Sequence, residues 1–349
     1  MGTARTRRGS KPTLRAIAQV AGVSHVTVSL ALRNDPRLTV ATGQRVRGVA
    51  RRLGYVPDPR VAELMGSLRL GRMGAPTTEI AFLSFKHPVY GVKDSPTAQR
   101  FFRGAEARAK QLGFRLERFV IDADSLTEER VSAILRARAI RGVLIAPLPK
   151  DVGALKLEWG RLAVVAFGHS LADPRVHRVS AHHAHTMRLA LRELASRGYR
   201  RCGVYLREGL NARVDDAWLA MYYYHWHTSH PGVAPIPPLI AETWKRAQFE
   251  SWFRAHRPDA VVTIQLPALE WLQALAPVPR AAGFAHLDWS EEMGDVAGID
   301  QQSERVGAAG LEQVAAQLLQ HEYGIPNNQK TIWSEGVWRE GATARPPGV

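Results

Sequence analysis

Short apolar runs alternate with helix-forming stretches along most of this chain, from about residue 79 onward. Three of these runs, 80–85, 142–146 and 260–264, are apolar almost throughout and are bounded by polar or turn-forming residues. Continuous apolar runs of this length are typical of strands buried on both faces of a sheet. Their alternation with helices predicts a doubly wound parallel α/β fold, and roughly 270 residues are enough for two lobes. Strands are expected at 80–85, 116–121, 142–146, 162–167, 202–206, 260–264, 280–284 and 296–299, and helices near 98–112, 128–137, 186–196 and 215–227.

Positive charge is concentrated at the amino end. The chain has 47 Lys and Arg against 32 Asp and Glu, a net charge of +15. The first 75 residues carry a net charge of +11, so the remaining 274 carry only +4. Such a basic module is expected to bind a polyanion such as nucleic acid, and a solubilising basic tail is the alternative.

The basic region also has the pattern of a small folded unit. Helices are expected at 14–21, 25–32 and 40–53. Thr13 and Ser24 are suitable N-caps for the first two, Gly22 suits the turn between them, and Leu53 is expected in the core. With the small Ala18 at the helix crossing, this pattern predicts a helix-turn-helix, whose second helix enters the major groove. A three-helix bundle without a nucleic-acid role is the alternative.

A linker follows the three helices. Residues 55–76 have two prolines at the front, Pro57 and Pro59, and glycines at the rear, with one short helix expected at 60–68. About nine residues are too few for a stable helix alone in water, so this helix is expected to form conditionally.

Other chemistry is poorly supported by the sequence. Two clusters of histidines could be metal ligands, but 13 histidines in 349 residues make chance clusters common. Cys202 begins an apolar run and is expected to be a buried small side chain rather than a nucleophile. We therefore expect no enzyme activity, no cofactor and no metal. The histidine clusters are His182, His183 and His185, and His225, His227 and His230.

The most specific part of the chain is the stretch 14–32, with the motifs Val20-Ala-Gly-Val-Ser24 and Thr27-Val-Ser29, followed by Arg51-Arg-Leu-Gly-Tyr-Val-Pro57. These motifs resemble the lactose-repressor (LacI/GalR) family of bacterial transcription regulators. The resemblance implies an all-α helix-turn-helix head, joined by a hinge helix to an α/β two-lobed domain like the type I periplasmic-binding proteins. Weaker similarity continues at 194–201, 257–262, 282–284 and 298–302.

The resemblance also implies a division of the chain. The expected parts are a DNA-binding domain at 1–57 with a basic arm at 1–11, a hinge helix and linker at 58–76, an effector-binding and dimerisation domain at 77–340, and a flexible tail at 341–349. The expected lobes of the third part are an N-lobe of 77–200 and 302–326 and a C-lobe of 201–301 and 327–340.

DNA contacts can be placed by the same resemblance. Leu30 stands where the family often has Arg, so an apolar contact such as a thymine methyl is expected there. Leu64 aligns with the leucine that relatives insert into the minor groove. The full expected set is Thr13, Leu14, Ser24, His25, Val26, Thr27, Ser29, Leu30, Arg33, Asn34, Tyr55 and Leu64.

The expected effector site departs further from the family. Arg213 and Trp244 match ligand-contacting positions, but the acidic anchors of sugar-binding relatives are missing. An anionic or neutral ligand is therefore expected. An anion is expected to bind more tightly as the histidines gain protons near pH ~6.5. The expected set is Arg213, Trp244, Gln265, His286, His182, His183 and His185.

Together these features predict a sequence-specific DNA-binding regulator, a repressor by family, whose affinity for DNA is modulated by a small-molecule effector such as a sugar or sugar derivative. The expected partners are a pseudo-palindromic double-stranded operator, the effector and a second copy in a homodimer, in the cytoplasm at the bacterial nucleoid. No stretch approaches the ~20 apolar residues of a membrane span, and no secretory signal is evident. A solute-binding protein or an enzyme on the same two-lobed scaffold is the alternative.

Overall fold

The computed structural model describes residues 13–32, 38–53, 55, 78–86, 95–122, 126–149 and 153–348. The chain divides into two compact units, 1–77 with 315–323 and 78–314 with 324–349, which are taken in turn. Among the described helices, none is by itself long and apolar enough to span a membrane. The first two satisfy that criterion only as a pair bent by 102°.

Three helices form the head: α1 (Leu14–Ala21), α2 (His25–Leu32) and α3 (Val40–Arg52). The three predicted helices are confirmed, and Ile17, Val28 and Val46 are fully buried at their shared core. The prediction that Leu53 is buried is wrong, since its side chain is 37% exposed. The helix ends at Arg52, and Tyr55 packs against the core from beyond that end.

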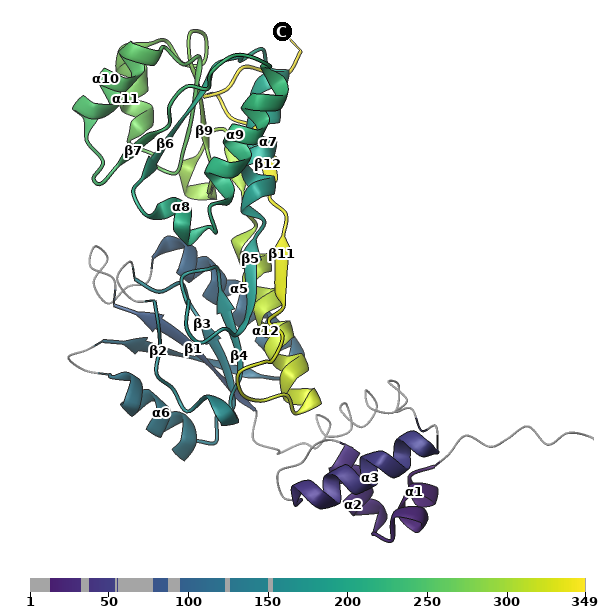
Figure 1. Cartoon of the computed structure of the whole chain (residues 1–349). Helices are drawn as coiled ribbons and strands as arrows, with labels where there is room; N and C mark the ends of the chain where they lie inside the picture. Colours follow the sequence, from purple (N-terminus) through teal and green to yellow (C-terminus); the bar gives the residue numbers. More distant parts are fainter. Residues whose placement is uncertain are drawn as a thin grey trace, which may run out of the picture. The chain divides into compact units, whose positions relative to one another are not determined.

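The first lobe is built on a parallel sheet in the order β11-β5-β4-β3-β1-β2 (Figure 1). Its strands are β1 (Glu79–Phe85), β2 (Arg115–Ile121), β3 (Gly142–Ile145), β4 (Ala163–Phe167), β5 (His177–Ala181) and β11 (Thr331–Ser334). Helix α6 (Glu128–Ala137) packs on one face through Val131 and Leu135. Helix α5 (Pro96–Leu112) packs closely against α12 (Ser303–Gln320), because a Cβ on Gly104 would lie 1.8 Å from the carbonyl oxygen of Glu304. A short 3-10 turn, Trp159–Arg161, precedes β4.

The second lobe has a sheet in the order β12-β10-β9-β8-β6-β7, parallel except for the β10–β12 pair. Its strands are β6 (Cys202–Arg207), β7 (Leu239–Ala241), β8 (Ala260–Thr263), β9 (Gly283–His286), β10 (Gly298–Asp300) and β12 (Val337–Arg339). Helix α7 (His183–Ser196) lies beside α9 (Ala217–Ser229), and α10 (Arg246–His256) lies beside α11 (Ala268–Leu275) (Figure 1). Two short elements complete the lobe, α8 (Leu210–Arg213) and a 3-10 turn at Glu291–Met293.

The chain passes between the two lobes three times, and two of the predicted passage points are wrong. The division at residue 200 is too late, because α7 already packs into the core of the second lobe through Met187 and Leu191. The prediction that residues 327–340 belong to the second lobe is wrong for β11, which pairs with β5 of the first sheet before the chain crosses to β12. Which lobe a segment joins depends on its pairing partner, which a local apolar pattern does not specify.

Two further expectations are corrected near the carboxyl end. The strand expected at 280–284 begins three residues later, after the turn that contains Pro279. The tail expected to be flexible from residue 341 is held at Thr343, whose Oγ1 donates to the carbonyl of Phe284 at 3.0 Å and accepts from the amide of Ala297 at 2.9 Å. These bonds tie Thr343 to the amino ends of β9 and β10, and Thr343 and Ala344 are buried there.

Candidate nucleic-acid interface and ligand site

The turn between α1 and α2 fixes how the two helices cross. Gly22 adopts a left-handed conformation with φ of +63°, which a side chain with a Cβ rarely adopts. The amide of Val23 donates to the carbonyl of Ala18 at 3.1 Å and closes the end of α1. The small Ala18 is only 9% exposed at the crossing. The bend of 102° between the helices is the geometry of a helix-turn-helix.

The amino end of α2 is exposed and polar. Ser24 caps it, its Oγ accepting a 3.1 Å hydrogen bond from the amide of Thr27. His25 and Val26 are exposed, Val26 to 53%. Leu30 and Ser29 lie one turn further on and are half-buried. This end of the helix therefore presents hydroxyl, imidazole and apolar groups outward, a mixture suited to phosphates and base edges.

The other predicted DNA-contacting residues have different roles or lie outside the described chain. Thr13 is exposed and its Oγ1 accepts a hydrogen bond from the amide of Ala16, which leaves it at the surface as a cap. Leu14 and Tyr55 pack against the head core, so their first role in the structure is support. Arg33, Asn34 and Leu64 fall outside the described residues.

One arginine of α3 was missed by sequence reasoning. Arg47 Nη1 donates to the carbonyl oxygen of Ala31 at 3.1 Å and so satisfies a carbonyl in the last turn of α2. A cation at the end of a helix also favours the negative end of its dipole. Arg47 and Ala31 are 16 residues apart, so no local sequence pattern predicts this hydrogen bond.

The second candidate site is the lobe junction, which we define as the residues that follow the carboxyl ends of the strands in both sheets. Ligands of α/β sheets bind at such strand ends. Arg213 of α8 lies here, and its Nη2 donates to the carbonyl oxygen of Leu148 at 2.7 Å, which joins the second lobe to the first. Burial lowers the pKa of Arg213, and Arg207 lowers it further. The predicted ligand-binding cation is therefore already engaged with protein.

A buried polar cluster lies at the junction beside this contact. The His183 ring meets the Trp218 indole edge to face at 5.5 Å, and the Nδ1 and Nε1 atoms of these rings are buried without a hydrogen-bond partner. Arg178 Nη1 lies 3.4 Å from His169 Nδ1. Burial lowers the pKa values of both His169 and Arg178, against an opposing effect of the negative charge of Asp215, whose φ is +57°.

The histidine titration expected near pH ~6.5 is wrong for two residues at the junction. Burial lowers the pKa of His183 to about 3, with smaller effects from His169 and His182. Burial also lowers the pKa of His286, against an opposing effect of Asp288. A desolvated imidazolium is disfavoured, so both rings are neutral near pH 7.

A carboxylate occupies the junction, so the expectation that acidic anchors are missing there is wrong. Asp288 accepts hydrogen bonds from Arg100 Nη2 to both of its oxygens at 2.7 Å and from Thr97 Oγ1 at 3.0 Å. Both donors belong to α5 of the first lobe, and the amide of Asp288 donates to His286 Nδ1 at 3.1 Å. Asp288 comes only two residues after the end of β9, so its place at the junction could have been predicted from the tendency of ligands to bind at strand ends.

The remaining predicted effector residues are spread along the junction. His182 caps α7 and accepts from the amide of His185, whose Nδ1 lies 3.8 Å from Glu335. Just after β8, the backbone amide of Gln265 donates to Thr263 Oγ1. Trp244 packs edge to face on Tyr205, with the ring centroids 4.9 Å apart. Within the described ranges, no three His, Cys, Asp or Glu side chains are placed to hold a metal ion.

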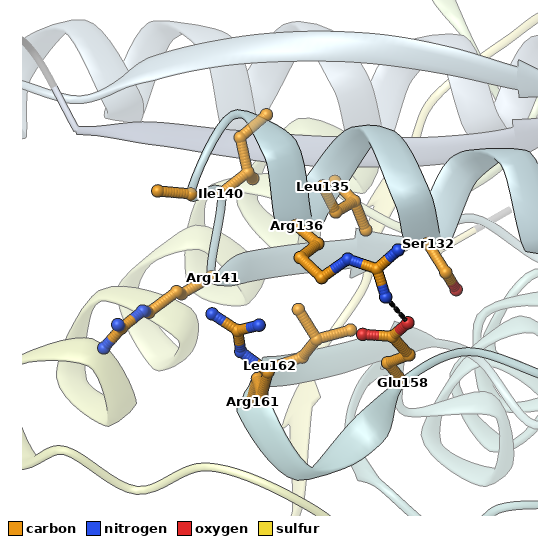
Figure 2. Close-up of a pocket in the computed structure, with 9 residues that line it drawn as sticks. Ser132, Leu135, Arg136, Ile140, Arg141, Glu158, Arg161 and Leu162 are labelled. Carbon is orange, nitrogen blue, oxygen red and sulfur yellow. Dashed lines mark hydrogen bonds and ion pairs between the residues drawn. The ribbon is translucent and has the colours of Figure 1, made fainter. Parts of the chain in front are cut away.

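A pocket in the first lobe is too small to be the effector site. It has a volume of about 20 Å³, room for roughly one water molecule. Figure 2 shows Arg136 of α6 paired with Glu158 among the residues that line it, with Arg141 and Arg161 also in the lining. These residues lie at the amino ends of β3 and β4, away from the lobe junction.

Comparison with known proteins agrees with this geometry. Residues 13–58 match a family described as bacterial regulatory proteins, lacI family. The HTH-type transcriptional regulator PtxS of Pseudomonas plecoglossicida is 28% identical over 201 residues, 57% of this chain, and the match spans 54% of that relative's length.

Solved structures match over nearly the whole chain. A transcriptional regulator CelR–cellobiose complex has a TM-score of 0.59 and 19% identity, covering 95% of this chain and 99% of that one. A lac repressor dimer bound to operator and the anti-inducer ONPF has a TM-score of 0.56 and 16% identity, covering 97% and 100%. The predicted fold class, a helix-turn-helix head followed by a two-lobed α/β domain, is confirmed.

Proposed function

We infer that this chain belongs to the lacI family of bacterial regulatory proteins. Its proposed function is sequence-specific DNA binding in transcriptional regulation. The main support for DNA binding is the geometry of the head, in which α1 and α2 are bent by 102° and the capped amino end of α2 is exposed. The net charge of +11 over residues 1–75 supports it, because lysine and arginine neutralise DNA phosphates. His25, Val26 and Leu30 read base edges in this proposal, and Ser24, Thr27 and Ser29 bind phosphates.

The lobe junction is the proposed effector site. Two contacts tie the lobes together there, Arg213 to the Leu148 carbonyl and Asp288 to Arg100. A small polar molecule that replaces either contact with its own hydrogen bonds changes the relative free energy of joined and separated lobes. Since cationic, anionic and neutral imidazole groups all meet there, a hydroxyl-rich molecule such as a sugar or sugar derivative suits the junction.

The remaining assignments follow from the same proposal. The protein acts as a homodimer on a pseudo-palindromic operator, since two heads related by a two-fold axis bind two half-sites. Arg33 and Asn34 bind the backbone, and Leu64 inserts into the minor groove. The site of action is the bacterial cytoplasm at the nucleoid. An enzymatic role is not part of the proposal.

Selection of genomic DNA fragments with the purified full chain tests the function. The selected duplex should bind with a log–log salt slope of magnitude well above ~5, at about −0.9 for each neutralised phosphate. A panel of sugars, sugar acids and sugar phosphates added to this complex should change its affinity for at least one member. Binding that is insensitive to salt, or equal on selected and random duplexes, contradicts the proposal.

A further inference from the structure

A second pocket lies within the second lobe, between α7, α9 and the start of β6. Its volume is about 280 Å³. Its lining includes Leu191 and Ala195 of α7, Tyr222 and Trp226 of α9, and Cys202 of β6. Figure 1 shows α7 and α9 side by side at this place. We call it the α7–α9 pocket.

This pocket is separate from the lobe junction. Cys202 is the first residue of β6, whereas the junction follows the carboxyl ends of the strands. Along α7, the junction residue His183 and the pocket residue Ala195 are twelve positions apart, about 18 Å at 1.5 Å per residue. A molecule in the α7–α9 pocket therefore does not reach the effector site proposed above.

The walls of the pocket are aromatic and aliphatic, and most of their polar atoms are already used. The Tyr222 hydroxyl is held between the carbonyl oxygens of Cys202 and Ile236, at 3.2 and 2.8 Å. Trp226 Nε1 donates to the carbonyl of Val233 at 2.9 Å. With these polar atoms already bonded, the rings of Tyr222 and Trp226 offer mainly apolar surface to the pocket, which suits a flat apolar ligand body.

One buried polar atom in the wall has no partner. His230 stacks on the Trp226 ring at 4.6 Å, and its Nδ1 is buried without a hydrogen bond. A second imidazole, His225, lines the same pocket and has its pKa lowered by burial. A buried polar atom without a hydrogen bond is unfavourable, so a ligand with an acceptor or donor at this point would gain affinity.

A cation lies at the edge of the pocket. Arg200 Nη1 donates to the carbonyl of Ala195 at 2.9 Å, and among the described residues its guanidinium has no carboxylate at ion-pair distance. Asp259 nearby accepts instead from the backbone amides of Arg200 and Arg201, at 2.7 and 2.8 Å. The guanidinium therefore keeps donors available for an anion.

We propose that the α7–α9 pocket binds a small aromatic carboxylate, with the ring between Leu191 and Trp226 and the carboxylate toward Arg200 and His230. The volume suits this size, since an apolar cavity of about 150 Å³ holds benzene and 280 Å³ leaves room for one substituent. An aromatic ring on Trp226 and a charge-assisted hydrogen bond to Arg200 together distinguish this class from aliphatic acids and from neutral aromatics.

Calorimetric titration of the full chain with sodium benzoate tests the proposal, with benzyl alcohol and sodium acetate as probes that lack the charge or the ring. We expect benzoate to bind, benzyl alcohol to bind at least about tenfold more weakly, and acetate to show no heat of binding. Absence of benzoate binding up to about 10 mM overturns the proposal.

Three variants locate the binding, each checked for an unchanged thermal unfolding transition. Ala195→Leu fills the pocket and should abolish benzoate binding. Arg200→Met should remove the preference for benzoate over benzyl alcohol. Arg201→Met is the matched control, since this exposed arginine bonds to the carbonyls of His256 and Arg257 and does not line the pocket. Unchanged binding in Ala195→Leu, or an equal loss in Arg201→Met, refutes the assignment.

Discussion

The head and the lobe junction present their polar side chains in opposite ways. At the amino end of α2, Ser24, His25 and Val26 are exposed on a scaffold that places them without enclosing them. At the junction, Arg213 and Asp288 are engaged across the two lobes at 2.7 Å. A surface can meet a partner as large as DNA without rearrangement, whereas a closed set of contacts must exchange partners to admit a ligand.

Removal of the head should have the greatest effect on DNA binding. A chain lacking residues 1–77 should lose at least about 1,000-fold in DNA affinity, because it loses the basic charge and α2 together. Fluorescence anisotropy on a selected duplex measures this, and circular dichroism checks that the α/β unit still unfolds cooperatively. Retained affinity would place DNA binding in the lobes instead.

The next largest effect is expected at the junction. Asp288→Asn removes the charge that faces Arg100, and both side chains are largely buried, at 20% and 14% exposed. Breaking such a pair should lower the free energy of unfolding by about 2–3 kcal/mol, measured by urea denaturation. The exposed pair Arg103–Glu304 is the control, and Glu304→Gln should cost less than about 0.5 kcal/mol. Equal effects of the two variants would mean that the junction is not enclosed.

The enclosure of the junction should also appear in the pH dependence of stability. Folding keeps His183 neutral, with its pKa lowered to about 3, while the unfolded chain binds a proton below ~6.5. Unfolding therefore takes up a proton between these values, and stability is lost as the pH falls through that range. Between pH 7 and 5 this contribution is about 2 kcal/mol, and His183→Asn should remove it.

Urea denaturation at both pH values measures this difference for the wild type and the variant. His227→Asn, at an exposed position of α9, is the matched control and should keep the acid sensitivity of the wild type. If His183→Asn loses stability with acid as steeply as the wild type, the junction admits water and is open to solvent like the head.

The smallest effect is expected at the bases. Leu30→Arg should shift preference toward guanine at one position of each half-site, because arginine can bond guanine in a bidentate manner. Since residue 30 is half-buried against the head, the gain should lie near the lower end of the usual range, about 1 kcal/mol. Sequence selection with both proteins measures it, and an unchanged selected motif would mean that residue 30 does not face the bases.

Local signals in the sequence are enough to predict the three helices of the head and the turn between the first two. Thr13, Gly22 and Ser24 act within three residues of their positions, as caps and as a left-handed turn, so their structural roles follow from local chemistry. The same holds for buried strands such as β1 and β3, whose continuous apolar runs have few other stable placements. The α/β class and the order of most elements follow from these local signals.

Which residues meet at the lobe junction, and where the chain passes between the lobes, depends on long-range packing. Strand β5 carries polar residues among its buried ones, so no apolar run marks it, and its neighbour β11 joins it from about 150 residues away. Asp288 meets Arg100 across 188 positions, and Arg213 meets Leu148 across 65. Contacts of this kind depend on the packing of whole lobes, and side chains near each other only in space leave no periodic pattern in the chain.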